Sequence, residues 1–128
     1  MGRQRLFGLA AATALLAACG DATAPVSDGV LRATATRREV RLTNASAVPV
    51  WAVVIGSEGS ALVDLTLNQC VDAARCPPIA PGGTRTVPRP TFNNRPEREA
   101  VVYHWRAAPD SAGVLRATGW GTLTVRFP

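Results

Sequence analysis

Short apolar runs follow one another along residues 30–127, many of them alternating with polar residues and separated by Gly, Pro and Asn. A period of two is typical of a β-strand with one covered face. In residues 38–44, for example, Val40 and Leu42 alternate with polar neighbours. No long window has the period of an amphipathic helix. The pattern therefore predicts an all-β domain.

The expected strands are residues 30–36, 38–44, 48–55, 61–67, 84–88, 100–107, 114–118 and 121–127. The last two form either one bent strand or a hairpin about Gly119, Trp120 and Gly121. Residues 48–55 are apolar on both faces, which predicts a central strand. Residues 89–97 are rich in Pro and Asn and are expected to be irregular. About seven to eight strands at this spacing predict a small antiparallel β-sandwich.

Two segments resemble those of bacterial immunoglobulin-like domains. Residues 42–50 (LTNASAVPV) are similar to the strand–turn–strand opening of such domains, and residues 81–84 (PGGT) are similar to the turn before a middle strand. The resemblance implies an immunoglobulin-like sandwich over residues 30–128. The Cys–Trp–Cys spacing of antibody domains is absent, so the resemblance concerns architecture and implies nothing about function.

Residues 1–18 have the order of a secretory signal peptide. Arg3 and Arg5 give a positive start, and residues 6–16 form an apolar run. This run is shorter than the roughly 20 residues that a membrane-spanning helix needs. We therefore expect an export signal that is removed from the mature protein.

The segment Leu16-Ala17-Ala18-Cys19 resembles the lipobox of bacterial lipoproteins. The resemblance implies cleavage before Cys19, a diacylglyceryl group on its sulfur, and acyl chains such as palmitate that hold the protein at a membrane. Two alternatives stay open, an ordinary secretory signal with an incidental cysteine and a buried apolar helix of the fold.

Residues 19–29 are small and polar after the cysteine, and we expect them to form a flexible tether. In enteric-type lipoproteins, Asp directly after the lipidated cysteine favours the inner membrane, whereas this chain has Gly20 there and Asp21 one position later. The resemblance therefore favours the outer membrane, facing the periplasm, if the host is Gram-negative.

The charge of the chain argues against nucleic acid as a partner. Every basic residue is Arg, and without Arg3 and Arg5 twelve arginines stand against nine acidic residues. These arginines are spread along the chain rather than clustered in one basic stretch. We expect the partners to be a membrane, through the lipid on Cys19, and an envelope protein.

Cys70 and Cys76 remain once Cys19 is lipidated. An even number of cysteines in an oxidising compartment predicts a disulfide across this short loop. A zinc site and a redox-active pair are the alternatives, but the spacing is not C-x-x-C and the chain has a single histidine.

The residues with catalytic potential do not form a recognisable motif. His104, the histidine of the chain, is expected on the polar face of its strand, and a catalytic role would need a nearby nucleophile and carboxylate. Paired carboxylates of the glycosidase kind could come from Glu39, Glu58, Asp64, Glu97 or Glu99. Their arginine neighbours favour surface ion pairs instead. We expect no enzyme, no cofactor and no metal site.

The aromatic residues and one arginine-rich loop supply the candidate interaction surface. Trp51 and Trp105 lie in apolar strands and are expected in the core, whereas Trp120 lies between two glycines and is expected to be exposed. Residues 85–98 carry four arginines, with Arg89, Phe92 and Arg95 as candidate contacts. The sequence thus predicts a non-enzymatic interaction or structural module. The alternative is a small-ligand or carbohydrate binder that uses Trp120 and this loop, which could also be merely solvated.

Overall fold

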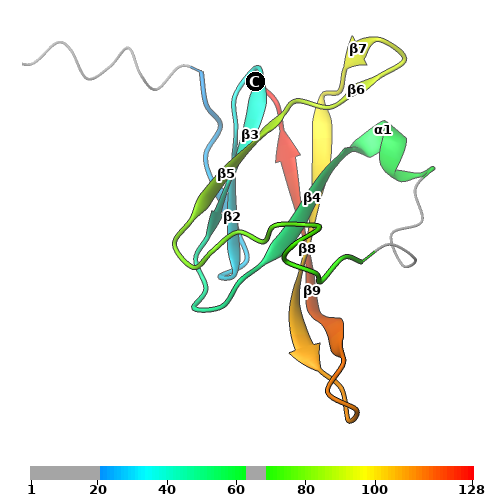
Figure 1. Cartoon of the computed structure of the whole chain (residues 1–128). Coiled ribbons are helices and arrows are strands. Elements are labelled where there is room, and N and C mark those ends of the chain that lie inside the picture. The colour runs from blue at the N-terminus through cyan, green and yellow to red at the C-terminus, as the bar shows by residue number, and fades with distance from the viewer. Residues whose placement is uncertain (1–20, 63–68) are drawn as a thin grey trace, which may run out of the picture.

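A computed structural model describes residues 21–62 and 69–128 and places most of them in antiparallel strands (Figure 1). In chain order the elements are β1 (Val26–Ser27), β2 (Leu31–Ala35), β3 (Glu39–Asn44), β4 (Trp51–Gly56), α1 (Ser57–Ser60), β5 (Thr84–Pro88), β6 (Thr91–Phe92), β7 (Arg95–Pro96), β8 (Glu99–Pro109) and β9 (Leu115–Arg126). The lipobox with Cys19, and most of the strand predicted at residues 61–67, lie outside the described residues.

The first sheet has the strand order β1-β2-β3-β5, with every pair antiparallel. Its alternation follows the sequence, since Val40 and Leu42 of β3 are fully buried while Arg41 between them is exposed. In β2 every second residue from Leu31 is likewise buried. The first sheet therefore presents one apolar face to the interior.

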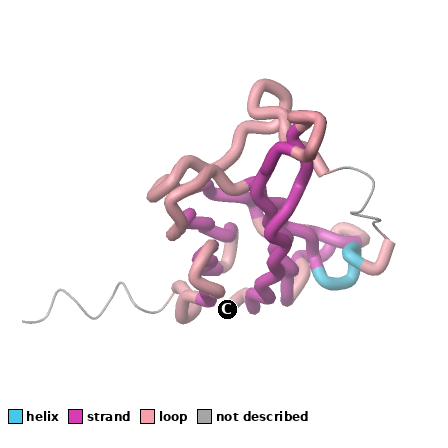
Figure 2. The backbone as a smooth tube through the Cα atoms, turned by 90° about the horizontal axis from the view of Figure 1, so that it is seen from below, coloured by secondary structure: helices cyan, strands magenta, loops and turns pink. Residues whose placement is uncertain are grey.

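The second sheet has the order β4-β8-β9, and its inner face packs on the first sheet through residues such as Val102, Leu123 and Val125. With β2, β3 and β5 taken as strands A, B and E, and β4, β8 and β9 as C, F and G, the order is that of immunoglobulin-like sandwiches. Figure 2 shows the strands joined by loops, with the short helix α1 at one side. The predicted all-β antiparallel sandwich is confirmed.

The central strand of the second sheet differs from the prediction. Among the described residues β8 is central and β4 is an edge strand, so the prediction of a central strand at residues 48–55 is wrong. On the outer face of β4, Trp51 is buried under the disulfide loop, as described below, and the residues that follow it are half-buried. Within residues 21–62 and 69–128, an isolated bridge between Val50 and Ile79 precedes β4 and is the pairing found on this side of the sheet.

β9 is one continuous strand, so the alternative of a single bent strand is confirmed. Its register with β8 shifts between His104 and Arg106, at a β-bulge where Gly119 has a φ of +63°. Beyond this bulge β8 and β9 continue past the end of β4 as a two-stranded arm (Figure 1). The arm ends in the turn at residues 110–113.

Residues 89–97 are more regular than expected, because β6 and β7 form a short hairpin there. Asn93 and Asn94 make its turn, with φ values of +50° and +61°. Two successive residues with positive φ are the requirement of a type I′ turn, and Asn tolerates that conformation better than most residues. The Asn-Asn pair is thus a hairpin signal in the sequence.

The segment predicted as a tether runs partly along the edge of β2. Ala22 forms a bridge with Thr36, the N–H of Thr23 donates to the carbonyl of Ala35 at 2.9 Å, and β1 continues the pairing. An unpaired strand edge offers a row of free N–H and C=O groups, and this segment satisfies part of the row on β2. Only Gly20 and Asp21 therefore separate Cys19 from the first paired residue.

Candidate functional site

His104 lies in the core, so the prediction of a histidine on a polar strand face is wrong. It is 1% exposed and faces inward from β8. Its Nε2 lies 2.6 Å from Oδ2 of Asp28, which belongs to the turn between β1 and β2. Gly121 on β9 leaves room for the ring, because a Cβ there would lie 2.3 Å from Nε2.

The carboxylate of Asp28 organises the turn on which it lies. Its Oδ1 accepts the N–H groups of Val30 and Leu31, each at 3.0 Å. Burial acts to raise the pKa of Asp28, but the bonds from Leu31 and Val30 and the contact with His104 outweigh burial and hold this pKa below its ordinary value. The pair therefore joins the N-terminal turn to the opposite sheet.

This geometry gives His104 a structural contact rather than a triad. In a triad the second ring nitrogen meets a nucleophile while the first meets the carboxylate. Nδ1 of His104 is buried and has no hydrogen-bond partner in the part of the chain that the structure describes.

The predicted disulfide between Cys70 and Cys76 is confirmed, with an S–S distance of 2.08 Å. Its loop lies on the outer face of the second sheet. There the indole N–H of Trp51 donates to the carbonyl of Cys76 at 2.7 Å, and that of Trp105 donates to the carbonyl of Cys70 at 2.9 Å. No group of three metal-ligating side chains gathers within residues 21–62 and 69–128.

Trp51 and Trp105 are cross-strand partners and are 7% and 6% exposed. Their burial agrees with the prediction, but they lie under the disulfide loop and outside the main cluster between the sheets. Trp120 is 44% exposed, as expected, and its ring centre lies 5.1 Å from that of Trp105 with the planes tilted by 31°. The three tryptophans therefore form one aromatic group on the outer face.

The structure separates the other candidate contacts from Trp120. Phe92 and Arg95 lie in the β6–β7 hairpin, beside the start of β8, whereas Trp120 lies opposite Trp105 near the bulge. Six residues of β8 between these two levels correspond to roughly 20 Å. The described residues therefore hold two separate candidate surfaces.

Arg89 has a structural role that no local sequence pattern indicates. Its Nε donates to the carbonyl of Glu97 at 2.7 Å and its Nη1 to that of Arg37 at 3.1 Å. The guanidinium carbon also lies 4.5 Å from the centre of the Phe127 ring. These contacts tie the segment after β5 to the β2–β3 turn and to the C-terminus.

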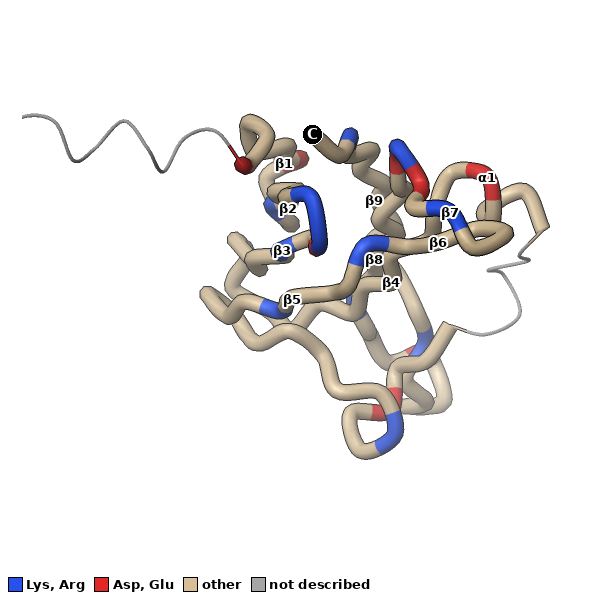
Figure 3. The backbone as a smooth tube through the Cα atoms, turned by 90° about the horizontal axis from the view of Figure 1, so that it is seen from above, with Lys and Arg blue, Asp and Glu red and all other residues tan. Residues whose placement is uncertain are grey.

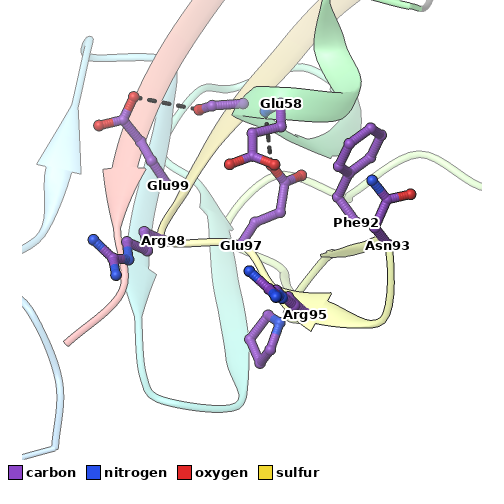
Figure 4. A pocket seen from close by; sticks show the side chains of 9 residues that line it. Glu58, Phe92, Asn93, Arg95, Glu97, Arg98 and Glu99 are labelled. Atoms are coloured by element: carbon purple, nitrogen blue, oxygen red, sulfur yellow. Dashed lines mark hydrogen bonds between the residues drawn. The ribbon is translucent and has the colours of Figure 1, made fainter.

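A pocket of about 570 Å³ lies between α1 and the β6–β7 hairpin (Figure 4). Phe92 and Arg95 line it together with the carboxylates of Glu58, Glu97 and Glu99. Its volume is within the range of small-molecule sites, about 300–1,000 Å³. Two residues of the predicted interaction surface, Phe92 and Arg95, thus line a pocket in the part of the chain that the structure describes.

The carboxylates of this pocket are engaged in the fold. Glu97 is 5% exposed, and its Oε1 accepts the N–H of Glu58 at 2.6 Å. It thereby caps α1, whose first residue is preceded by Gly56 without a side chain. Ser57 Oγ donates to Glu99 at 3.3 Å, and Arg126 Nε lies 3.4 Å from the other oxygen of Glu99.

The expectation of surface ion pairing is therefore met by Glu99, whereas Glu97 is buried. Glu39 lies at a second hollow, beside Asp21. Asp64 lies outside the described residues.

The molecule is thus a small immunoglobulin-like sandwich with an aromatic outer face under a disulfide loop and a polar pocket at one end. No family model, no curated protein and no solved structure matches this chain. None of the helical residues described here makes a segment with the length and hydropathy needed to cross a membrane.

Proposed function

We propose that the chain is a membrane-anchored lipoprotein of the cell envelope, and that its sandwich acts as a non-enzymatic interaction or structural module. One feature of the chain carries the proposal, the lipobox-like segment 16–19 that directly precedes the sandwich. Acyl chains on Cys19 would hold the domain at a membrane, since each buried methylene contributes about 0.8 kcal/mol.

The disulfide supports the proposed location of the protein in an oxidising compartment outside the cytosol. Disulfides persist in the periplasm and outside the cell, and are rare in a reducing cytosol. The bond between Cys70 and Cys76 therefore agrees with an exported protein.

The test is the intact mass and membrane fractionation of the full-length protein beside the variant Cys19→Ala. We expect the wild type to lose residues 1–18, gain the mass of acyl chains and sediment with membranes, and the variant to gain no acyl mass. The double variant Cys70→Ala/Cys76→Ala is the matched control, because it also removes cysteines but should keep the acyl mass. A soluble, unacylated wild type would refute the proposal.

The second candidate function is the binding of a small ligand or carbohydrate, and the pocket between α1 and the β6–β7 hairpin favours it. Phe92 offers an aromatic ring and Arg95 a guanidinium group at its wall. Saturation-transfer NMR with a panel of monosaccharides tests this function. Transfer that is lost in Phe92→Ala but kept in Trp120→Ala would support binding in this pocket, and no transfer to any sugar would count against it.

A further inference from the structure

We propose that one end of the sandwich lies against an anionic phospholipid surface, with Arg37, Arg38 and Arg98 at the level of the headgroup phosphates. This end, called the tether end below, is where Ala22 pairs with Thr36. The proposal rests on the lipidation of Cys19 proposed above and adds the orientation and the lipid chemistry.

The distance from the anchor to the fold is short. Gly20 and Asp21 are the residues between Cys19 and the first paired residue, Ala22. Three residue steps span at most about 10 Å when fully extended. Acyl chains on Cys19 would therefore hold Ala22, beside the β2–β3 turn, within about 10 Å of the membrane interface, while the β8–β9 arm extends from the opposite end of the sandwich (Figure 1).

Two exposed arginines lie where the chain enters the fold. Arg37 and Arg38 form the turn between β2 and β3, directly after Thr36. With Asp21 and Glu39 they line a hollow of about 430 Å³. The turn is held in place by Arg89, whose backbone N–H donates to the carbonyl of Arg38 at 2.8 Å.

Arg98 belongs to the same end of the molecule. Its carbonyl accepts the N–H of Phe127 at 2.9 Å, and the Phe127 ring lies against the guanidinium of Arg89. Figure 3, which looks onto this end from above, shows arginines on the β2–β3 turn, after β5, on β7 and beside the C-terminus.

The charges of these three arginines are available to phosphates. Within the described ranges, no carboxylate lies within 4.0 Å of the guanidinium groups of Arg37, Arg38 or Arg98. Of the acidic residues nearby, Glu97 is buried and Glu99 is paired with Arg126. Glu97 and Glu99 therefore do little to neutralise Arg37, Arg38 and Arg98, although they add two negative charges to this end.

The anchor makes the contact effective. Asp21 and Glu39 also lie at this end, so long-range attraction to a membrane is weak. Attraction to an anionic surface decays over a Debye length, about 8 Å at physiological ionic strength. A link of about 10 Å holds the arginines near that range, where a guanidinium can meet a phosphate directly.

Arginine footprinting by mass spectrometry tests the orientation, because every basic side chain of this protein is Arg. Full-length protein with the acyl mass confirmed is reconstituted in vesicles of phosphatidylcholine, with and without phosphatidylglycerol, and treated with phenylglyoxal. On the anionic vesicles we expect the modification of Arg37, Arg38 and Arg98 to slow by about fivefold relative to the neutral vesicles. Arg116 on the arm and Arg75 in the disulfide loop should react at unchanged rates.

Two charge variants separate headgroup contact from net charge. Arg37→Gln/Arg38→Gln should abolish the protection of Arg98. Arg32→Gln/Arg41→Gln, which removes the same charge from exposed positions on β2 and β3, should keep it.

Equal rates on both vesicles, uniform slowing of all arginines, or equal effects of the two variants would each overturn the orientation while leaving the lipoprotein proposal intact. A chain without acyl mass would overturn both proposals.

Discussion

We expect substitution of Asn44 to lower the stability of the fold more than most other single substitutions. The Asn44 side chain is fully buried at the end of β3 and makes four hydrogen bonds. Its Nδ2 donates to the carbonyls of Val48 and Ile79, at 2.7 and 2.9 Å. Its Oδ1 accepts the N–H and the Oγ–H of Ser46, at 2.9 and 2.7 Å. The amide thus closes the turn from β3 to β4 and ties it to the segment that precedes β5.

The variant Asn44→Ala should lose about 2–3 kcal/mol of unfolding free energy. Four hydrogen bonds at about 1 kcal/mol each set the upper range. The loss is smaller because the carbonyl of Ile79 also accepts the N–H of Val50. In addition, the one Oγ–H of Ser46 has both Asn44 Oδ1 and the carbonyl of Val48 within reach, so in the variant it can donate to Val48 alone. At roughly 4 °C per kcal/mol for a domain of this size, the melting temperature should fall by about 10 °C.

Thermal unfolding followed by circular dichroism measures this change, with Ser111→Ala in the exposed arm turn as the control that should melt like the wild type. Asn44→Asp should destabilise at least as much as Asn44→Ala. It retains the acceptor for Ser46 but replaces a donor with an oxygen facing two carbonyls. A shift below about 2 °C in Asn44→Ala would refute the assignment of the turn to this side chain.

Three further predictions concern the core and the disulfide. Cys70→Ser/Cys76→Ser should cost about 2–2.5 kcal/mol by the loop-entropy model, and an unchanged denaturant midpoint would contradict that role. Gly121→Ala should destabilise by at least about 2 kcal/mol, because its Cβ would lie 2.3 Å from the His104 ring. Gly113→Ala, whose Cβ meets nothing within 4 Å at a φ of +78°, measures the separate cost of a positive φ without a clash. Asp28 has a lowered pKa in the folded protein, so its contribution to stability is present above its unfolded pKa of about 3.9 and is lost as the pH falls through the folded value. The stability of the wild type should therefore fall more steeply than that of Asp28→Asn below about pH 4, and parallel curves would argue against the effect.

Much of the sandwich could be predicted from local sequence. The strands at β2 and β3 follow from alternation because each has one buried face, and β5 alternates between exposed and half-buried residues. Residues 42–50 form a strand–turn–strand unit, as expected, and Asn44 gives the physical reason, since its side chain makes the hydrogen bonds that fix this turn.

The candidate site was harder to predict because its residues depend on contacts between distant segments. Arg89 looked like a free arginine in a polar loop, but its partners lie in the β2–β3 turn and at Glu97 and Phe127. The burial of Glu97 depends on the N–H of Glu58, which is 39 residues away in sequence. No local pattern reports such pairings.

The second sheet shows why strand faces were misassigned. β8 carries apolar residues on both faces, so alternation could not tell which face is inward. The inner face packs on the first sheet and contains His104, a polar residue that is buried because Asp28 pairs with it. The outer face is apolar because Trp105 lies beneath the disulfide loop, with its N–H bonded to the carbonyl of Cys70. The disulfide loop also explains why Trp51 is buried on β4. This edge strand is therefore as hydrophobic as a central strand would be. A short disulfide loop thus replaces a packing layer on this face, and the two cysteines are the sequence signal that a strand pattern alone does not include.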